Sequence, residues 1–82
     1  MKALVIDDSR AIRMIIARQL GTLGFVTVQA ADGLEGLRAV ATSGPFDIVL
    51  VDWNMPVMNG LQFVLEIRRD RALDEMAIMM VT

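Results

Sequence analysis

Four residues of this sequence could carry out chemistry together, because they stand at the ends of runs of apolar residues. They are Asp7, Asp8, Asp52 and Thr82. Carboxylates held about 4 Å apart repel by roughly 4 kcal/mol per pair at an effective dielectric constant of about 20, so a cluster needs a cation, a proton or abundant water. Oxygen ligands alone favour Mg²⁺ or Mn²⁺. A divalent cation among carboxylates favours phosphate chemistry, because the metal can bridge a carboxylate and a phosphoryl oxygen.

The composition removes several other classes of function. The chain of 82 residues has no cysteine and no histidine, which excludes disulfides, thiol nucleophiles, zinc–thiolate sites and histidine-based catalysis. The net charge of −2 offers no basic stripe for nucleic acid. No apolar run approaches the roughly 18 residues of a membrane span, and no signal-peptide pattern opens the chain. We therefore expect a single cytoplasmic domain without membrane contact.

The hydrophobic pattern divides the chain into alternating strands and helices. Strands are expected at 2–6, 25–30, 48–51 and 77–81. The first helix is expected to run from Ser9 to Gly21 or Gly24, the second from Asp32 to Gly44, and the third over about 61–70. Asp32 and Glu35 resemble a capping box at the start of the second helix. For the third helix the predicted inward-facing residues are Leu61, Val64, Leu65 and either Phe63 or Ile67.

This alternation predicts a parallel sheet, because each connection between strands contains a helix and such crossovers are right-handed. The unbroken apolar run at 48–51 is typical of a central strand that is buried on both faces. The carboxyl ends of parallel strands share one edge of the sheet, where α/β proteins bind ligands. We therefore expect the three aspartates and the threonine to meet at that edge.

Each of these residues also has a plainer interpretation. The two aspartates after the first strand could cap the first helix and interact with its positive end. Asp52 could be a turn aspartate, and Thr82 an ordinary strand residue. Arg10 and Arg13 are interpreted as part of a solvated helix face. The joint placement of the four residues at strand ends is what favours a site.

Three motifs together resemble the receiver domain of two-component response regulators, close to the chemotaxis type. They are residues 5–10 (Val-Ile-Asp-Asp-Ser-Arg), 51–60 (Val-Asp-Trp-Asn-Met-Pro-Val-Met-Asn-Gly) and 80–82 (Met-Val-Thr). The resemblance covers the whole chain. It implies an α/β, flavodoxin-like doubly wound parallel sheet with the element order β-α-β-α-β-α-β and the strand order 2-1-3-4.

The resemblance also implies roles for individual residues. Asp52 would be the phosphoacceptor, taking a phosphoryl group from a histidine kinase or phosphotransfer protein, so the domain would not itself be an enzyme. Asp8 would bind Mg²⁺ directly and Asp7 partly through water, with the backbone carbonyl of Asn54 and the Asp52 carboxylate as further ligands. Thr82 would be the switch hydroxyl that bonds the phosphoryl group.

The sequence departs from the family after its fourth strand. The family pattern continues with a helix, a fifth strand that starts with a phosphoryl-binding lysine, and a fifth helix. The only lysine here, Lys2, begins the first strand and belongs to the opposite edge of the sheet. We therefore expect residues 1–82 to be one receiver-like domain, incomplete at its C-terminal end and impaired in phosphorylation. We also expect it to self-associate through an exposed sheet edge.

Two other classes of function remain open. One is a truncated receiver fragment without phosphorylation chemistry that acts only in interaction or oligomerisation. The other is an aspartate-nucleophile phosphatase of the haloacid dehalogenase type, which would want an aspartate where Asn54 stands. A dinucleotide-binding domain is disfavoured, because no glycine-rich turn follows the first strand.

Overall fold

The computed structural model describes residues 1–81, so Thr82 lies outside the described residues. A parallel sheet has four strands in the order β2-β1-β3-β4. The strands are β1 (Lys2–Ile6), β2 (Val26–Ala30), β3 (Ile48–Asp52) and β4 (Ala77–Val81). The helices are α1 (Arg10–Thr22), α2 (Gly33–Ser43), α3 (Gly60–Arg68) and a short 3-10 helix, η1 (Arg71–Leu73). The predicted flavodoxin-like class and strand order are confirmed.

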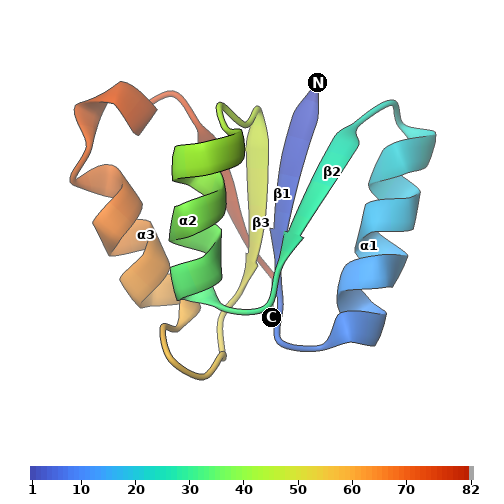
Figure 1. Ribbon diagram of the computed structural model, residues 1–82, viewed down its shortest axis with the longest axis horizontal. Coiled ribbons are helices and arrows are strands. Elements are labelled where there is room, and N and C mark those ends of the chain that lie inside the picture. Colours follow the sequence, from blue (N-terminus) through green and yellow to red (C-terminus); the bar gives the residue numbers. More distant parts are fainter. Residues whose placement is uncertain (82) are drawn as a thin grey trace.

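The helices cover the two faces of the sheet unequally (Figure 1). Helices α2 and α3 pack against each other on one face, and α1 packs on β1 and β2 from the other. Right-handed crossovers produce this arrangement, because the step from β1 to β2 runs opposite to the next two steps across the sheet. We call the face under α2 and α3 the closed face and the face under α1 the open face.

Alternation along each strand assigns its side chains to these faces. The closed face carries Leu4, Ile6, Val28, Ala30, Val49, Val51, Ile78 and Met80. The open face carries Ala3, Val5, Thr27, Gln29, Ile48, Leu50, Ala77 and Met79. The two sets differ in burial over β3 and β4, where α1 does not reach.

The main hydrophobic core fills the closed face. The side chains of Leu4, Val49 and Phe63 have no exposed surface. Helix α2 approaches this core closely at Gly36, where an added Cβ would lie 2.5 Å from the Ile6 side chain and 3.0 Å from the Phe63 ring. Residues from two strands and two helices thus pack without space for one more methyl group.

The open face is only partly covered. None of the described residues of α1 is buried, and Ile12 and Ile15 are exposed. On β4, Met79 is 53% exposed. The prediction that β3 is buried on both faces is wrong for Ile48 and Leu50, which are only half-buried. The reason is that α1 lies over β1 and β2, away from these two positions.

Helix α3 turns a different side to the sheet from the one expected. Phe63 and Ile67 are buried and Val64 is half-buried, whereas Leu61 and Leu65 are exposed. The predicted inward face is therefore wrong for these two leucines. Apolar residues occupy most of the circumference of α3, so their spacing does not select a side; packing against α2 and the closed face does.

The capping of α2 and α3 also differs from the prediction. Asp32 accepts a hydrogen bond from the Glu35 backbone N–H, which is one half of the expected capping box. The complete reciprocal arrangement occurs at α3 instead, where Asn59 and Gln62 bond each other's backbone N–H groups at 2.9 Å. Glutamine can close a capping box as glutamate does. The start of α3, directly after the Asp52 loop, is therefore firmly fixed.

Candidate functional site

The register of the sheet places two of the predicted aspartates side by side. Ile6 of β1 pairs with Val51 of β3, so the residues that follow them, Asp7 and Asp52, are neighbours at the carboxyl ends of these strands. Both follow closed-face residues, so their side chains belong to the open face. Asp8 comes next in the turn that leads into α1. Parallel pairing thus brings residues far apart in the sequence to one point.

The three carboxylates form one cluster. Each of Asp7, Asp8 and Asp52 offers an oxygen atom, and these oxygens lie within 4.8 Å of one another. Within residues 1–81 the only ion pair joins Arg69 to Glu66, so no cationic side chain forms an ion pair with the cluster. Dense negative charge on oxygen donors fits Mg²⁺ or Mn²⁺. The donor set therefore supports the predicted metal.

Asp7 is the most buried member of the cluster, with 8% of the residue exposed. Burial is the largest cause that raises the pKa of its carboxyl above the ordinary value. The Ser9 backbone N–H donates to Asp7 Oδ1 at 2.8 Å and opposes this rise in pKa. The negative charges of Asp52 and Asp8, and a side-chain hydrogen bond with Asp8, raise the pKa of Asp7 further. A bound cation would offset the repulsion among these three carboxylates.

The start of α3 lies directly against the end of β3. The Gly60 N–H donates to the Trp53 carbonyl oxygen at 3.1 Å. A Cβ added at Gly60 would collide with the Asp52 backbone oxygen and lie 2.8 Å from the Met80 side chain. Glycine is thus required by close approach, whereas the sequence marked it only as the start of a helix. This contact holds the backbone of Asp52 in place.

The loop between Asp52 and α3 contains a strained residue that the sequence did not reveal. Val57 has a φ of 69°, and the Met58 N–H donates to the Pro56 carbonyl oxygen across it at 2.7 Å. This hydrogen bond closes a γ-turn with positive φ, which is rare. A β-branched residue is unusual at positive φ. Backbone strain therefore lies in the loop that follows Asp52, a common location for it in functional sites.

Comparison with known proteins identifies the family. The family model described as response regulator receiver domain matches residues 3–82. Chemotaxis protein CheY1 of Helicobacter pylori (strain J99) is 40% identical over 83 residues, covering 100% of this chain and 67% of that protein. The chain belongs to the response regulator receiver domain family. The resemblance drawn from the three sequence motifs is confirmed.

Solved receiver structures share the fold. The chemotaxis response regulator CheY4 of Vibrio cholerae is 39% identical, with a TM-score of 0.88, over 96% of this chain and 65% of that one. TrrA of Thermotoga maritima, solved in complex with Mg(2+)-BeF, is 30% identical, with a TM-score of 0.81, over 96% of this chain and 64% of that one. The chain thus spans about two thirds of the length of the relatives it matches.

The predicted site residues of this receiver can now be placed. Asp7, Asp8 and Asp52 are brought together as expected, and their individual roles stay predictions. Asn54 is exposed in the loop after β3, two residues beyond Asp52, and its role also stays a prediction. The predicted role of Thr82 falls outside the described residues. Receiver domains bind Mg²⁺ through acidic residues, and the cluster supplies such residues.

Two basic residues differ in their relation to the site. Lys2 lies at the opposite sheet edge, as expected, where its Nζ donates to the Ser43 carbonyl oxygen and sits 5.2 Å from the centre of the Phe46 ring. Arg13 corrects a prediction, because it is not simply solvated: its Nη1 donates to the Asp7 carbonyl oxygen at 2.7 Å. An arginine in the first turn of an amphipathic helix carries no sequence signal for such a contact.

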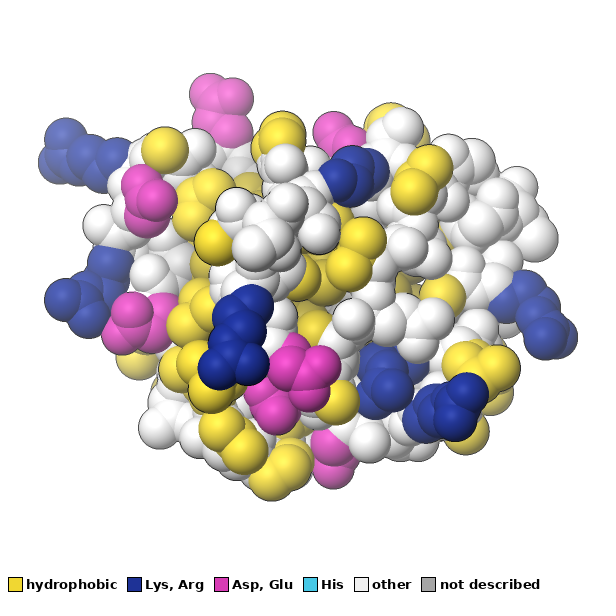
Figure 2. Space-filling view, in the orientation of Figure 1, with side chains coloured by type: hydrophobic (Ala, Val, Ile, Leu, Met, Phe, Trp, Pro, Cys, Tyr) yellow, Lys and Arg dark blue, Asp and Glu magenta, His cyan; other side chains and the backbone are white. Residues whose placement is uncertain are grey.

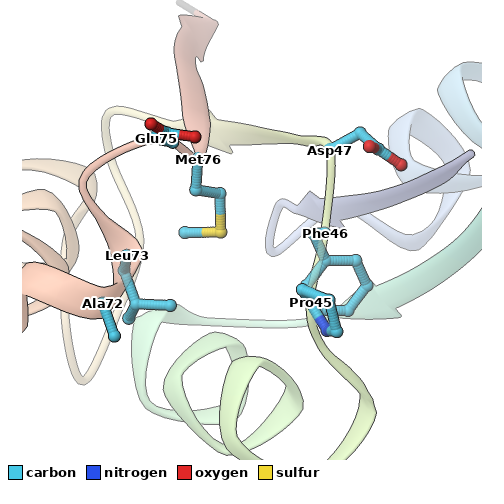
Figure 3. Close-up of a pocket in the computed structure, with 7 residues that line it drawn as sticks. All are labelled: Pro45, Phe46, Asp47, Ala72, Leu73, Glu75 and Met76. Atoms are coloured by element: carbon cyan, nitrogen blue, oxygen red, sulfur yellow. The ribbon is translucent and has the colours of Figure 1, made fainter.

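One hollow of the described surface lies away from the aspartates. A cavity of about 280 Å³ lies between the segments that lead into β3 and β4 (Figure 3). It is lined by Pro45, Phe46, Asp47, Ala72, Leu73, Glu75 and Met76. Because these residues precede the strands whereas Asp52 ends one, the cavity belongs to the opposite edge of the sheet.

On the face seen in Figure 2, basic side chains are scattered and mixed with acidic and hydrophobic ones. No helix within residues 1–81 has the length and apolar character needed to cross a membrane.

Proposed function

We propose that this chain is the phosphoacceptor module of a two-component phosphorelay, with Asp52 as the residue that is phosphorylated. The observation that carries this proposal is the cluster of three carboxylates within 4.8 Å, without a cationic side-chain partner in residues 1–81. Asp52 ends its strand, half-buried, at the edge where α/β folds bind ligands. TrrA, a receiver of the same fold, was solved with Mg(2+)-BeF, which supports phosphate chemistry at such a site.

The proposed reaction is transfer of a phosphoryl group from a phosphohistidine to Asp52. A carboxylate oxygen attacks phosphorus, the P–O bond forms as the P–N bond breaks, and the leaving imidazole nitrogen keeps the electron pair and takes up a proton. Water later hydrolyses the acyl phosphate and releases inorganic phosphate. Asp7, Asp8 and the Asn54 carbonyl would hold Mg²⁺, which when bound neutralises charge on the transferred oxygens.

The partners follow from this chemistry. The donor is a histidine kinase or phosphotransfer protein, with which receivers of this type interact. The module accepts a phosphoryl group and has no small-molecule substrate of its own, so we do not class it as an enzyme. We place it in the cytoplasm, because a histidine kinase draws its phosphoryl groups from ATP. Thr82 would bond the phosphoryl group and switch the conformation.

We further propose that phosphorylation of these 82 residues is slow. The only lysine in the sequence is Lys2, whose ammonium group is engaged with Ser43 at the far edge of the sheet. It cannot donate to a phosphoryl group on Asp52. Loss of one preorganised donor from such a site typically costs about 10²- to 10³-fold in rate.

The test is the intact mass of the protein after incubation with Mg²⁺ and acetyl phosphate, with an Asp52→Asn variant as control. We expect a slow gain of one phosphoryl group in the wild type and none in the variant. A gain of equal size in both proteins, or none in either, would contradict the assignment of Asp52. A histidine kinase core with ATP then serves as the physiological donor.

A second candidate function, self-association, is favoured by a different observation. The apolar side chains of Ile12, Ile15 and Met79 are exposed to solvent. Within residues 1–81, β4 is an edge strand with no strand paired to its outer side. Unprotected edge strands pair readily with other chains. We expect a dimer or larger assembly in light scattering that is weakened by Met79→Lys. A monomer at all concentrations would exclude this candidate.

A further inference from the structure

The backbone between the two N-terminal aspartates is held by a side chain from α1. The carbonyl of Asp7 belongs to the peptide unit that joins Asp7 to Asp8. Among the hydrogen bonds of the described residues, this carbonyl oxygen accepts from Arg13 Nη1 at 2.7 Å. The bond joins residues six positions apart, in the first turn of α1 and directly after β1.

The other atoms of Asp7 are held by the main chain. Its N–H donates to the Ala30 carbonyl oxygen at 3.1 Å, which continues the pairing of β1 with β2. Its Oδ1 accepts from the Ser9 N–H at 2.8 Å. These bonds fix the amide and the carboxylate of Asp7, and Arg13 holds the carbonyl of the peptide unit that follows. The plane of this peptide unit sets the direction in which the Asp8 side chain leaves the backbone.

Arg13 is itself well fixed for this purpose. Its backbone N–H donates to the Ser9 carbonyl oxygen at 3.0 Å, so its base is part of the capped first turn of α1. Its Nε donates to Gln29 Oε1 of β2 at 3.4 Å. The guanidinium group therefore links β1, α1 and β2, and a planar group with several fixed donors suits such a bridge.

The contact does not serve as charge compensation. Arg13 forms no ion pair with the clustered carboxylates within residues 1–81. Its donor meets a neutral carbonyl oxygen. A positive charge near a cation site in fact opposes binding of the cation. Any favourable effect of Arg13 on metal binding must therefore come through the geometry of the backbone.

We propose that Arg13 is a positioning residue for the metal site: by holding the Asp7–Asp8 peptide plane, it keeps both carboxylates directed toward Asp52. This inference rests on the metal site of the proposed function. Groups that orient metal ligands without contacting the metal commonly change affinity by about 10- to 100-fold when they are removed.

The test compares variants by direct metal binding. Mn²⁺ is titrated into the 82-residue protein while the signal of free Mn²⁺ is followed by electron paramagnetic resonance, and Mg²⁺ is then added as a competitor. Arg13→Met removes the donors but keeps a long side chain, and we expect its dissociation constant for Mn²⁺ to rise about tenfold. Removal of a positive charge alone would lower that constant. The two explanations thus predict opposite signs.

Arg18→Met is the matched control, because it removes the same charge from an exposed position on the same helix. We expect its affinity for Mn²⁺ to stay within about twofold of the wild type or to increase slightly. Arg13→Lys, which retains one donor, should recover most of the affinity lost in Arg13→Met. Thermal unfolding by circular dichroism checks that each variant is folded.

The outcomes separate this inference from the proposed function. Absence of Mn²⁺ binding by the wild type would overturn both. Binding by the wild type with equal or tighter binding by Arg13→Met would overturn the role of Arg13 alone. If Arg13→Met does not fold, Gln29→Leu is the deciding variant, because it removes the exposed side chain on β2 that holds the guanidinium. It should weaken Mn²⁺ binding about two- to threefold. Unchanged binding would overturn the role of Arg13.

Discussion

The two faces of the sheet serve different purposes. On the closed face, strand residues such as Leu4 and Val49 pack without exposed surface against Phe63 of α3. On the open face, α1 contributes no buried residue among those described, and Met79 of β4 is 53% exposed. The same four strands therefore support one dense apolar layer and one loosely covered layer.

The clustered aspartates occur on the open side of this division. Asp7 and Asp52 continue the alternation that places Val5 and Leu50 on the open face. A carboxylate needs water, a cation or hydrogen-bond donors, and the closed face offers none of these without losing apolar packing. The densest packing is thus concentrated in one layer, which leaves the other layer free to carry charge.

The largest effect should come from truncating the closed face. Phe63→Ala removes a ring with no exposed surface and should lower the free energy of unfolding by about 3–5 kcal/mol. Ile15→Ala on α1, which is exposed, should lower it by less than about 1 kcal/mol. Urea denaturation followed by circular dichroism measures both. Similar losses in the two variants would show that the faces contribute equally to stability.

A pair of glycines tests the same difference with a single added methyl group. Gly36→Ala would drive a Cβ into Ile6 and Phe63 and should destabilise by about 1–3 kcal/mol. Gly21→Ala in α1 meets nothing within 4 Å and should stabilise by about 0.5–1 kcal/mol, because alanine favours helix. Melting temperatures of the two variants should therefore move in opposite directions. A shift of both in one direction would be inconsistent with the packing described.

The smallest of the expected effects concerns the charge on the open face. Because the folded state raises the pKa of Asp7, it binds the proton more tightly than the unfolded chain does. Proton binding by Asp7 therefore stabilises the folded state fully below the ordinary pKa of 3.8. This stabilisation is lost as the pH rises through the raised pKa that Asp7 has in the folded state. Asp7→Asn should therefore raise the free energy of unfolding at pH 7, because it removes a charge that is buried and repelled there.

This prediction is tested by measuring the free energy of unfolding between about pH 3 and pH 8 with EDTA present, a range that includes the titration of most carboxylates. Asp74→Asn, at an exposed aspartate, serves as control. Relative to the wild type, the advantage of Asp7→Asn should grow with rising pH. An advantage that shrinks with rising pH, or that Asp74→Asn shares, would contradict the assignment of repulsion and burial to Asp7.

The topology and the location of the site could be predicted from the sequence. Apolar runs that end in Asp7 and Asp52 define two strands, and the intervening helical periodicity makes those strands parallel. Parallel strands place their carboxyl ends together, so the meeting of these aspartates followed without knowledge of any distance. The cap at Asp32 was equally local, since an aspartate before a helix accepts hydrogen bonds from backbone N–H groups within three residues.

The tertiary structure alone decided which side of each element is buried and which side chains support the site. Leu61 and Leu65 could have faced the sheet as well as Phe63 and Ile67 did, because several rotations of an apolar helix bury similar area. Arg13 reaches Asp7 only because α1 folds back over β1. Periodicity and capping depend on neighbours in the sequence, whereas these contacts depend on segments that meet only after the sheet has formed.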